Sequence, residues 1–280
     1  MTVSTELAGK LEEIFEFLQR NRHFNEHVQH CAYRQDVLPW LDTESKLRSL
    51  LYSKANTQSA PKLDLLAQAW KKLHIHRAAF GKVQTVGELV EALWLIGNSD
   101  LAAETKFAKL PVFEEMWLAL RSVAGFGEKT AALFVKSIVE IHTLDCNREL
   151  RFLQDFTVNP HDTLHVPVDK VILHIFAAIG MKSPNFTKIN AVIRKSGLIC
   201  EERPTLWDDL WFWGFITQKG ERETAQQTPT RRTMMNEPKF WSILGAPADQ
   251  LPEVTAAAEK FIAIVARTPK VTGPACIAAE

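Results

Sequence analysis

The stretch that decides the fold is Ser-Val-Ala-Gly-Phe-Gly-Glu-Lys-Thr-Ala, residues 122–131. Segments with helical periodicity precede and follow it, so Gly125 and Gly127 mark a tight turn between two helices. Glycine has no Cβ atom, and its backbone can turn sharply and adopt a positive φ. Such a turn directs amide N–H groups outward at the start of the second helix, which suits a phosphate group. The stretch therefore predicts a helix–hairpin–helix unit at about residues 112–141.

The positions of the glycines exclude two familiar nucleotide-binding motifs. A Gly-x-Gly-x-x-Gly motif would need glycine at Thr130, and a P-loop would need glycine directly before Lys129. The Gly-x-Gly tripeptide by itself is more often a structural corner between helices. The complete string of helix, hairpin and helix favours a phosphate site instead.

Helical periodicity continues along the chain on both sides of the hairpin. Apolar residues recur at spacings of three and four in residues 7–18, 45–53, 63–73, 86–96, 112–123, 128–141 and 169–179. Residues 206–217 are apolar nearly all round, which predicts a buried helix. No convincing run of alternating apolar and polar residues indicates a strand. The predicted fold class is therefore all-α.

The composition is that of a soluble globular protein, with 46% hydrophobic and 24% charged residues among 280. Its 33 basic residues balance its 33 acidic residues, so any basic face for nucleic acid must be local. Residues 62–82 carry a local net charge of +4. This segment could seat a phosphate backbone, although a solvated helix face would have the same pattern.

The cysteines and the termini indicate an intracellular protein. Cys31, Cys146, Cys200 and Cys276 include no Cys-x-x-Cys pair, so neither a zinc ribbon nor a cubane iron–sulfur cluster is expected. Scattered cysteines of this kind usually pack as small hydrophobic residues in a reducing compartment. The N-terminus lacks the basic start and apolar run of a signal peptide, and no apolar run is long enough to span a membrane.

A second informative segment is His165-Val-Pro-Val-Asp169, which precedes an apolar helix. Pro167 favours an extended approach to that helix. Asp169 is placed to cap it, with the carboxylate accepting a hydrogen bond from the amide of Val171 or Ile172. Whether Asp169 does more than cap depends on what faces it.

Together, the hairpin and this segment resemble the helix–hairpin–helix DNA glycosylase superfamily. Its signature is a Gly-x-Gly hairpin, a lysine two residues on and a downstream aspartate after valine, and Gly125, Gly127, Lys129 and Asp169 match all four positions. Within that superfamily the chain is most similar to the archaeal-type 8-oxoguanine DNA glycosylases. The long segment between Lys129 and Asp169, and the second lysine at Lys136, are two of the similarities.

The third similarity is residues 206–214, which resemble that family's helix of aspartate followed by tryptophan, with no iron–sulfur loop after it. The resemblance implies a two-lobed helical fold with the active-site cleft between the lobes. Residues 1–218 would form two interleaved helical lobes, and residues 219–239 a linker or exposed loop. Residues 240–280 would form peripheral helices and a tail. One departure is Val171, which stands where many relatives carry histidine.

The resemblance also implies an activity: a bifunctional DNA glycosylase and AP lyase of base excision repair. Such an enzyme flips a damaged purine, here expected to be 8-oxoguanine, out of the duplex and excises it. Lys129 would attack the sugar to form a Schiff base, and β-elimination would then nick the strand. Its amine must be neutral, and burial and the positive end of the helix both disfavour the ammonium form. Asp169 would be its electrostatic partner.

Further site residues follow from the same resemblance. The contacts with DNA would come from Gly125, Gly127, Thr130, Asn56, Gln58 and His174, with Asn56 or Gln58 filling the space left by the flipped base. The base pocket would be formed by Lys136, Asp208, Trp211 and Trp213, with Asp209 and Trp207 as alternatives in another register. Tryptophan at helical spacing is more often core than pocket.

The expected partner is double-stranded DNA that contains an altered base, bound by a cytoplasmic, nucleoid-associated monomer without contact to a membrane. No cofactor or metal is expected, although the hairpin carbonyls could hold a monovalent cation. Two other functions stay open. One is a glycosylase for another damaged or modified base, and the other is a catalytically inactive helix–hairpin–helix DNA-binding protein. The presence of both Lys129 and Asp169 counts against the second, because phosphate binding needs neither.

Overall fold

The computed structural model describes residues 4–266 apart from 59, 98–100, 102–108, 160–161 and 219–233. Every regular element in these residues is a helix, so the predicted all-α class is confirmed. The elements are α1 (Thr5–Val37), α2 (Thr43–Asn56), α3 (Leu63–Ile75), α4 (Arg77–Gly81), α5 (Val86–Ile96), α7 (Val112–Arg121), α8 (Glu128–Thr143), η1 (Asp145–Leu150), α9 (Lys170–Ala178), α10 (Phe186–Ser196), η2 (Leu206–Asp208), α11 (Asp209–Ile216), α12 (Glu237–Trp241), η3 (Ala248–Gln250) and α13 (Leu251–Ala266).

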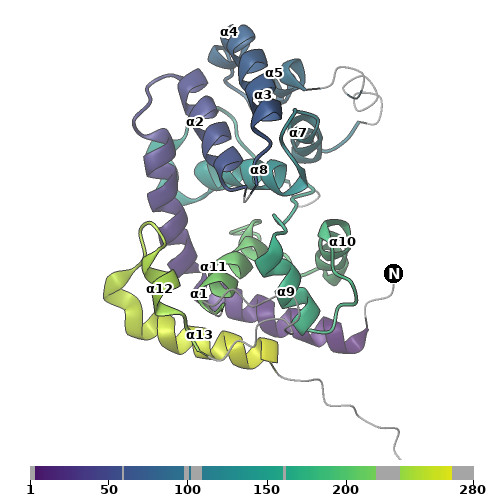
Figure 1. Ribbon diagram of the computed structural model, residues 1–280, viewed down its shortest axis with the longest axis vertical. Coiled ribbons are helices and arrows are strands. Elements are labelled where there is room, and N and C mark those ends of the chain that lie inside the picture. The colour runs from purple at the N-terminus through teal and green to yellow at the C-terminus, as the bar shows by residue number, and fades with distance from the viewer. Residues whose placement is uncertain are drawn as a thin grey trace, which may run out of the picture.

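Two hydrophobic cores organise these helices. The first core is formed by α2 to α8, with Tyr33 and Val37 from the end of α1. The second core is formed by the first part of α1 together with α9, α10, α11 and α13. In Figure 1 the first group of helices lies in the upper half of the view and the second in the lower half, and α1 passes from one to the other. The long helix α1 therefore belongs to both cores.

Local sequence signals explain where several helices begin and end. A capping box of Thr85 and Glu88 starts α5, and Gly97 follows its last residue, so the predicted segment 86–96 is confirmed at both ends. The predicted buried helix at 206–217 is also confirmed, as η2 followed by α11. Helix α10 was not expected, although Asn185 caps it and its buried residues Ile189 and Ile193 lie one turn apart.

The C-terminal helices are part of the second core. Phe240, Val254 and Phe261 are each fully buried, and α13 packs along α1. Helices are thus present after residue 240, as expected, and their apolar faces fill part of the second core. Most of the expected linker and the tail after Ala266 lie outside the described residues. No helix in the described part of the chain is long and apolar enough to cross a membrane.

Candidate active site

The two hairpin glycines have different structural roles. Gly125 has a φ of +84°, and a Cβ atom there would lie 2.8 Å from Leu66 Cδ2 and 3.1 Å from the Leu66 backbone nitrogen. Gly127 is the N-cap of α8, with an extended backbone at φ −104°, and a Cβ atom there would meet nothing within 4 Å. The prediction of a positive φ is therefore confirmed for Gly125 and wrong for Gly127, where any residue fits sterically.

The connection between α2 and α3 lies against this hairpin. Gln58 Nε2 donates a hydrogen bond to the Gly125 carbonyl at 3.0 Å, and Lys129 Nζ donates to the Thr57 carbonyl at 3.3 Å. Asn56, the last residue of α2, is exposed. The structure thus brings together the two segments for which the sequence predicts DNA contacts.

Lys129 is the second residue of α8 and is half-buried. Its ammonium forms no ion pair with a carboxylate in the part of the chain that the structure describes, and this includes Asp169. The neighbouring Thr130 is only 3% exposed. A contact between Thr130 and DNA stays a prediction, and its backbone amide in the first turn of α8, rather than its buried side chain, is available for that role.

Asp169 caps α9 as predicted, because its Oδ1 accepts a hydrogen bond from the Ile172 amide at 3.0 Å. Helix α10 holds the segment that precedes Asp169 in place. The Val166 amide donates to Asn190 Oδ1 at 2.7 Å, and Asn190 Nδ2 donates to the Val166 carbonyl at 3.2 Å. Pro167 and Val168 are buried. The carboxylate is therefore fixed at the start of α9.

Trp117 on α7 connects the starts of α8 and α9. Its Nε1 donates to the Glu128 carbonyl in the first turn of α8 at 3.1 Å. Its indole lies 4.3 Å, between ring centroids, from the imidazole of His165, four residues before Asp169. His165 Nε2 also lies 2.8 Å from Glu114 Oε2. In Figure 1, α9 lies below α8. Trp117 thus forms a junction between the first turn of α8, which carries Lys129, and the segment that precedes Asp169. No hydrogen bond or ion pair joins Lys129 to Asp169 in the described residues.

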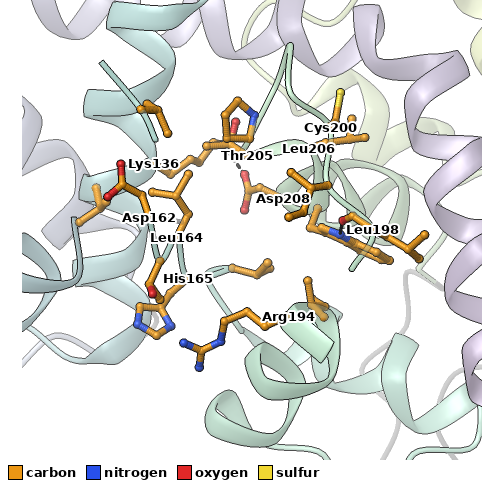
Figure 2. Close-up of a pocket in the computed structure, with 18 of the residues that line it drawn as sticks. Lys136, Asp162, Leu164, His165, Arg194, Leu198, Cys200, Thr205, Leu206 and Asp208 are labelled. Carbon is orange, nitrogen blue, oxygen red and sulfur yellow. Dashed lines mark hydrogen bonds and ion pairs between the residues drawn. The ribbon is translucent and has the colours of Figure 1, made fainter. Parts of the chain in front are cut away.

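A cavity of about 780 Å³ lies between the two cores, and its lining includes His165 and Pro167 but neither Lys129 nor Asp169. Val135 of α8 contributes to its lining from the first core, whereas Ile193, Leu206 and Trp207 line it from the second. The segment 162–167, which leads to Asp169, also lines it, as do residues 158–159, 197–201 and 204–205. Figure 2 shows that side chains from all these segments converge on the same space.

The cavity wall carries a buried ion pair between Lys136 and Asp208, each 5% exposed as a residue (Figure 2). Burial lowers the pKa of the Lys136 ammonium, but the charges of Asp208 and Glu140 outweigh it and raise the pKa above its ordinary value. Burial raises the pKa of the Asp208 carboxyl, against the opposing charge of Lys136. Hence Lys136 stays charged at neutral pH, and the wall offers both hydrogen-bond donors and acceptors.

Of the tryptophans considered for the base pocket, Trp207 lines this cavity, with its Nε1 donating to the Leu198 carbonyl at 3.1 Å. Trp213 has no exposed surface and packs among phenylalanines of the second core. Trp211 stacks on Phe215 and does not line the cavity. Trp211 and Trp213 therefore do not line this cavity, because the path from η2 into α11 turns their rings elsewhere, and their expected roles in a base pocket stay predictions.

His174 lies in the middle of α9, half-buried, and does not line the cavity. Its Nδ1 is buried and has no hydrogen-bond partner in the described residues. A contact between His174 and DNA stays a prediction.

Sequence reasoning missed a buried network behind the cavity wall. Glu140 and Arg203 are 0% and 1% exposed, respectively. Arg203 donates hydrogen bonds to both Glu140 and Asp209. One signal was available: Lys136 and Glu140 stand four residues apart in residues 131–141, where Ser137 is the one other polar residue.

Neither a metal cluster nor a disulfide is seen in the described residues. No group of three histidine, cysteine or acidic side chains there could hold a metal ion. Cys200 is buried as expected, but Cys31 is half-buried and Cys146 exposed, and Cys276 lies outside the described residues.

The chain matches no family model, no curated protein and no solved structure. No relative therefore carries an activity over to this chain, and a functional conclusion depends on the residues and the geometry described above.

Proposed function

We propose that the chain is a DNA glycosylase and AP lyase of the helix–hairpin–helix type, with 8-oxoguanine in duplex DNA as the expected substrate. The observation that carries the proposal is the junction at Trp117, which contacts both the start of α8 and the segment that leads to α9. Lys129 stands in the first turn of α8 behind the hairpin, and Asp169 caps α9, with Trp117 linking the two segments. The cavity beside this junction lies between the two cores, which would be the two lobes of such an enzyme.

The DNA would lie across the hairpin and the α2–α3 connection. Gly127 leaves open space over the first turn of α8, so a phosphate could approach its amide groups closely. Gln58 is tied to the Gly125 carbonyl and Asn56 is exposed beside it. One of these polar side chains would fill the space that a flipped base leaves in the duplex.

The chemistry would begin with attack of the Lys129 amine on C1′ of the sugar. The N–C1′ bond forms, and the bond from C1′ to the base nitrogen breaks with its electron pair leaving on the base. The Asp169 carboxylate stabilises the positive charge that develops on the sugar and accepts the proton that the lysine loses. The C1′–O4′ bond then breaks, and O4′ takes the proton that Asp169 holds, which leaves a Schiff base between Lys129 and the opened sugar. This Schiff base acidifies C2′–H. Removal of this proton expels the 3′ phosphate and nicks the strand.

The Lys136–Asp208 pair is suited to recognition of the excised base. Lys136 has three N–H donors and Asp208 has two acceptor oxygens, and the two groups are adjacent in the cavity wall. An 8-oxoguanine edge carries a carbonyl beside an N–H group, which complements such a pair. Trp207, also in the lining, supplies an aromatic surface.

A monovalent cation at the hairpin is not part of this proposal. The Gly125 carbonyl accepts from Gln58 Nε2, and the Val123 carbonyl accepts from the Phe126 amide at 3.1 Å. A cation would share oxygens that already accept hydrogen bonds, so these carbonyls do not form a set of free ligands for it.

The experiment is a panel of duplexes, each with one altered base, incubated with the protein and then with borohydride. We expect a trapped covalent adduct and a nick with the 8-oxoguanine duplex, and neither with the Lys129→Gln variant, which should still bind DNA. Lys188→Gln is the matched control, because Lys188 also lies in the first turn of a helix and donates to a backbone carbonyl.

Two outcomes would contradict parts of the proposal. A trapped adduct with Lys129→Gln would place the nucleophile elsewhere. Specific binding of wild-type protein to the duplexes without any adduct or base release would favour the inactive DNA-binding protein. An adduct with a different altered base would keep the enzyme and change its substrate.

Asp169→Asn should slow base release but keep the α9 cap, because asparagine also caps well.

A further inference from the structure

The Glu140 carboxylate is held by three hydrogen-bond donors from two separate parts of the chain, α1 and the segment before η2. It has no exposed surface. Its Oε2 accepts from the Tyr33 hydroxyl at 2.7 Å, and its Oε1 accepts from Thr205 Oγ1 at 2.8 Å and from Arg203 Nη2 at 3.1 Å. Burial by itself would raise the pKa of Glu140, but Lys136 and Arg203 outweigh it and bring the pKa below its ordinary value. The carboxylate is therefore charged and fixed.

This fixed carboxylate is next to the lysine of the cavity wall. Lys136 Nζ lies 3.6 Å from Glu140 Oε2 and also pairs with Asp208. Lys136 and Asp208 line the cavity, whereas Glu140 and Tyr33 do not. A lysine side chain has a flexible four-carbon stem and a compact charge, so a single partner leaves its position loosely defined. Two carboxylates, Glu140 and Asp208, restrict the ammonium more tightly than one would.

Arg203 does not depend on Glu140 as its counter-ion. Its guanidinium forms a bidentate pair with Asp209, at 2.8 and 2.7 Å, and lies 3.4 Å from Glu26. Two carboxylates would thus remain for Arg203 if Glu140 were neutral. What Glu140 alone supplies is the second carboxylate contact of the Lys136 ammonium, beside that of Asp208.

We propose that Glu140 is a positioning residue for base recognition, which holds Lys136 so that the Lys136–Asp208 pair meets the flipped base in one orientation. This inference rests on the proposed function, because it assumes that the cavity receives a base. It adds that selectivity depends on a side chain that never contacts the substrate. A purely structural Glu140 would instead affect every activity of the protein equally.

The test compares Glu140→Gln on two duplexes that differ only in the base. One contains the altered base that the wild-type protein excises, 8-oxoguanine in the first instance, and the other contains a preformed abasic site. The abasic duplex has no base to recognise, so nicking by Lys129 needs no ligand in the cavity. We expect the kcat/KM for base release to fall roughly tenfold or more, as for loss of a hydrogen bond to a charged group. Nicking of the abasic duplex should change less than about twofold.

Glu26→Gln is the matched control, since Glu26 contacts the same Arg203 but not Lys136. It should leave both reactions unchanged. Tyr33→Phe removes one donor to Glu140 at nearly constant volume and should reduce base release in the same selective way, even if Glu140→Gln folds poorly. In the background of Lys136→Met, Glu140→Gln should cause no further loss, because its effect acts through Lys136.

Equal losses on both duplexes, for Glu140→Gln or for Tyr33→Phe, would overturn the inference and assign Glu140 to the fold. An additive loss in the Lys136→Met background would overturn it as well. If wild-type protein cleaves neither duplex, the proposed function itself fails, and the inference fails with it.

Discussion

The same substitution at the two hairpin glycines should separate the fold from DNA binding. Serine at position 125 must adopt the left-handed backbone at φ +84°, and its Cβ would lie 3.1 Å from the backbone nitrogen of Leu66. The left-handed conformation by itself costs roughly 1–2 kcal/mol for a residue other than glycine. The approach to Leu66 adds to this, because backbone cannot move aside as a flexible side chain can. We expect Gly125→Ser to lower the free energy of unfolding by about 2 kcal/mol or more.

Serine at position 127 should have the opposite effect on stability. Gly127 has an extended backbone, and its Cβ position is open. Serine is among the best N-cap residues, so the free energy of unfolding should stay the same or rise by a few tenths of a kcal/mol. Its hydroxyl, however, would occupy the first-turn amides of α8 that a phosphate would need. We therefore expect Gly127→Ser to bind DNA several-fold more weakly, although the protein remains fully folded.

The measurements are thermal unfolding and the affinity for a duplex that contains an abasic-site analogue. For a chain of this size about 1 kcal/mol corresponds to 2–4 °C in Tm, so Gly125→Ser should melt roughly 4–8 °C lower. A Gly127→Ser protein with wild-type affinity would show that the hairpin is only a structural corner. A Gly125→Ser protein as stable as the wild type would refute the backbone reasoning.

Three other predictions concern the cores. Burial lowers the pKa of His142 to about 4, so its neutral form stabilises the fold above the ordinary value of 6.5, and this contribution is lost as the pH falls from 6.5 towards 4. Urea unfolding at about pH 7 and pH 5 checks this. The free energy of unfolding of the wild type should fall by about 2 kcal/mol more between these pH values than that of His142→Gln. Trp213→Ala should cost about 3–5 kcal/mol in denaturant unfolding, whereas Trp211→Ala should cost about 1 kcal/mol or less, and equal costs would contradict their different burial. Arg203→Met leaves buried carboxylates unpaired and should lower stability by about 3–5 kcal/mol, seen as a lower Tm.

The sequence by itself determined several of the helices and the chemistry of their ends. Apolar spacing of three and four residues reflects one buried face of a helix, so the positions of α5 and α8 follow from the residue pattern alone. The cap at Asp169 followed equally from local rules, since the bond from a capping carboxylate reaches only three residues along the chain. Gly125 and Gly127 marked the hairpin, but local sequence could not show which of them needs a positive φ.

Only the tertiary structure decided which side chains meet. Three tryptophans within seven residues were equally suited to a pocket, and the turn from η2 into α11 placed Trp207 at the cavity and Trp213 in the core. The second carboxylate on Lys136 is held in place by the packing of α8 between α1 and the segment before η2, because Tyr33 and Thr205 are distant from Glu140 in sequence. Hydrogen bonds within a helix are set by local spacing. Contacts between elements depend on how whole helices pack, and no local pattern in a single sequence encodes that packing.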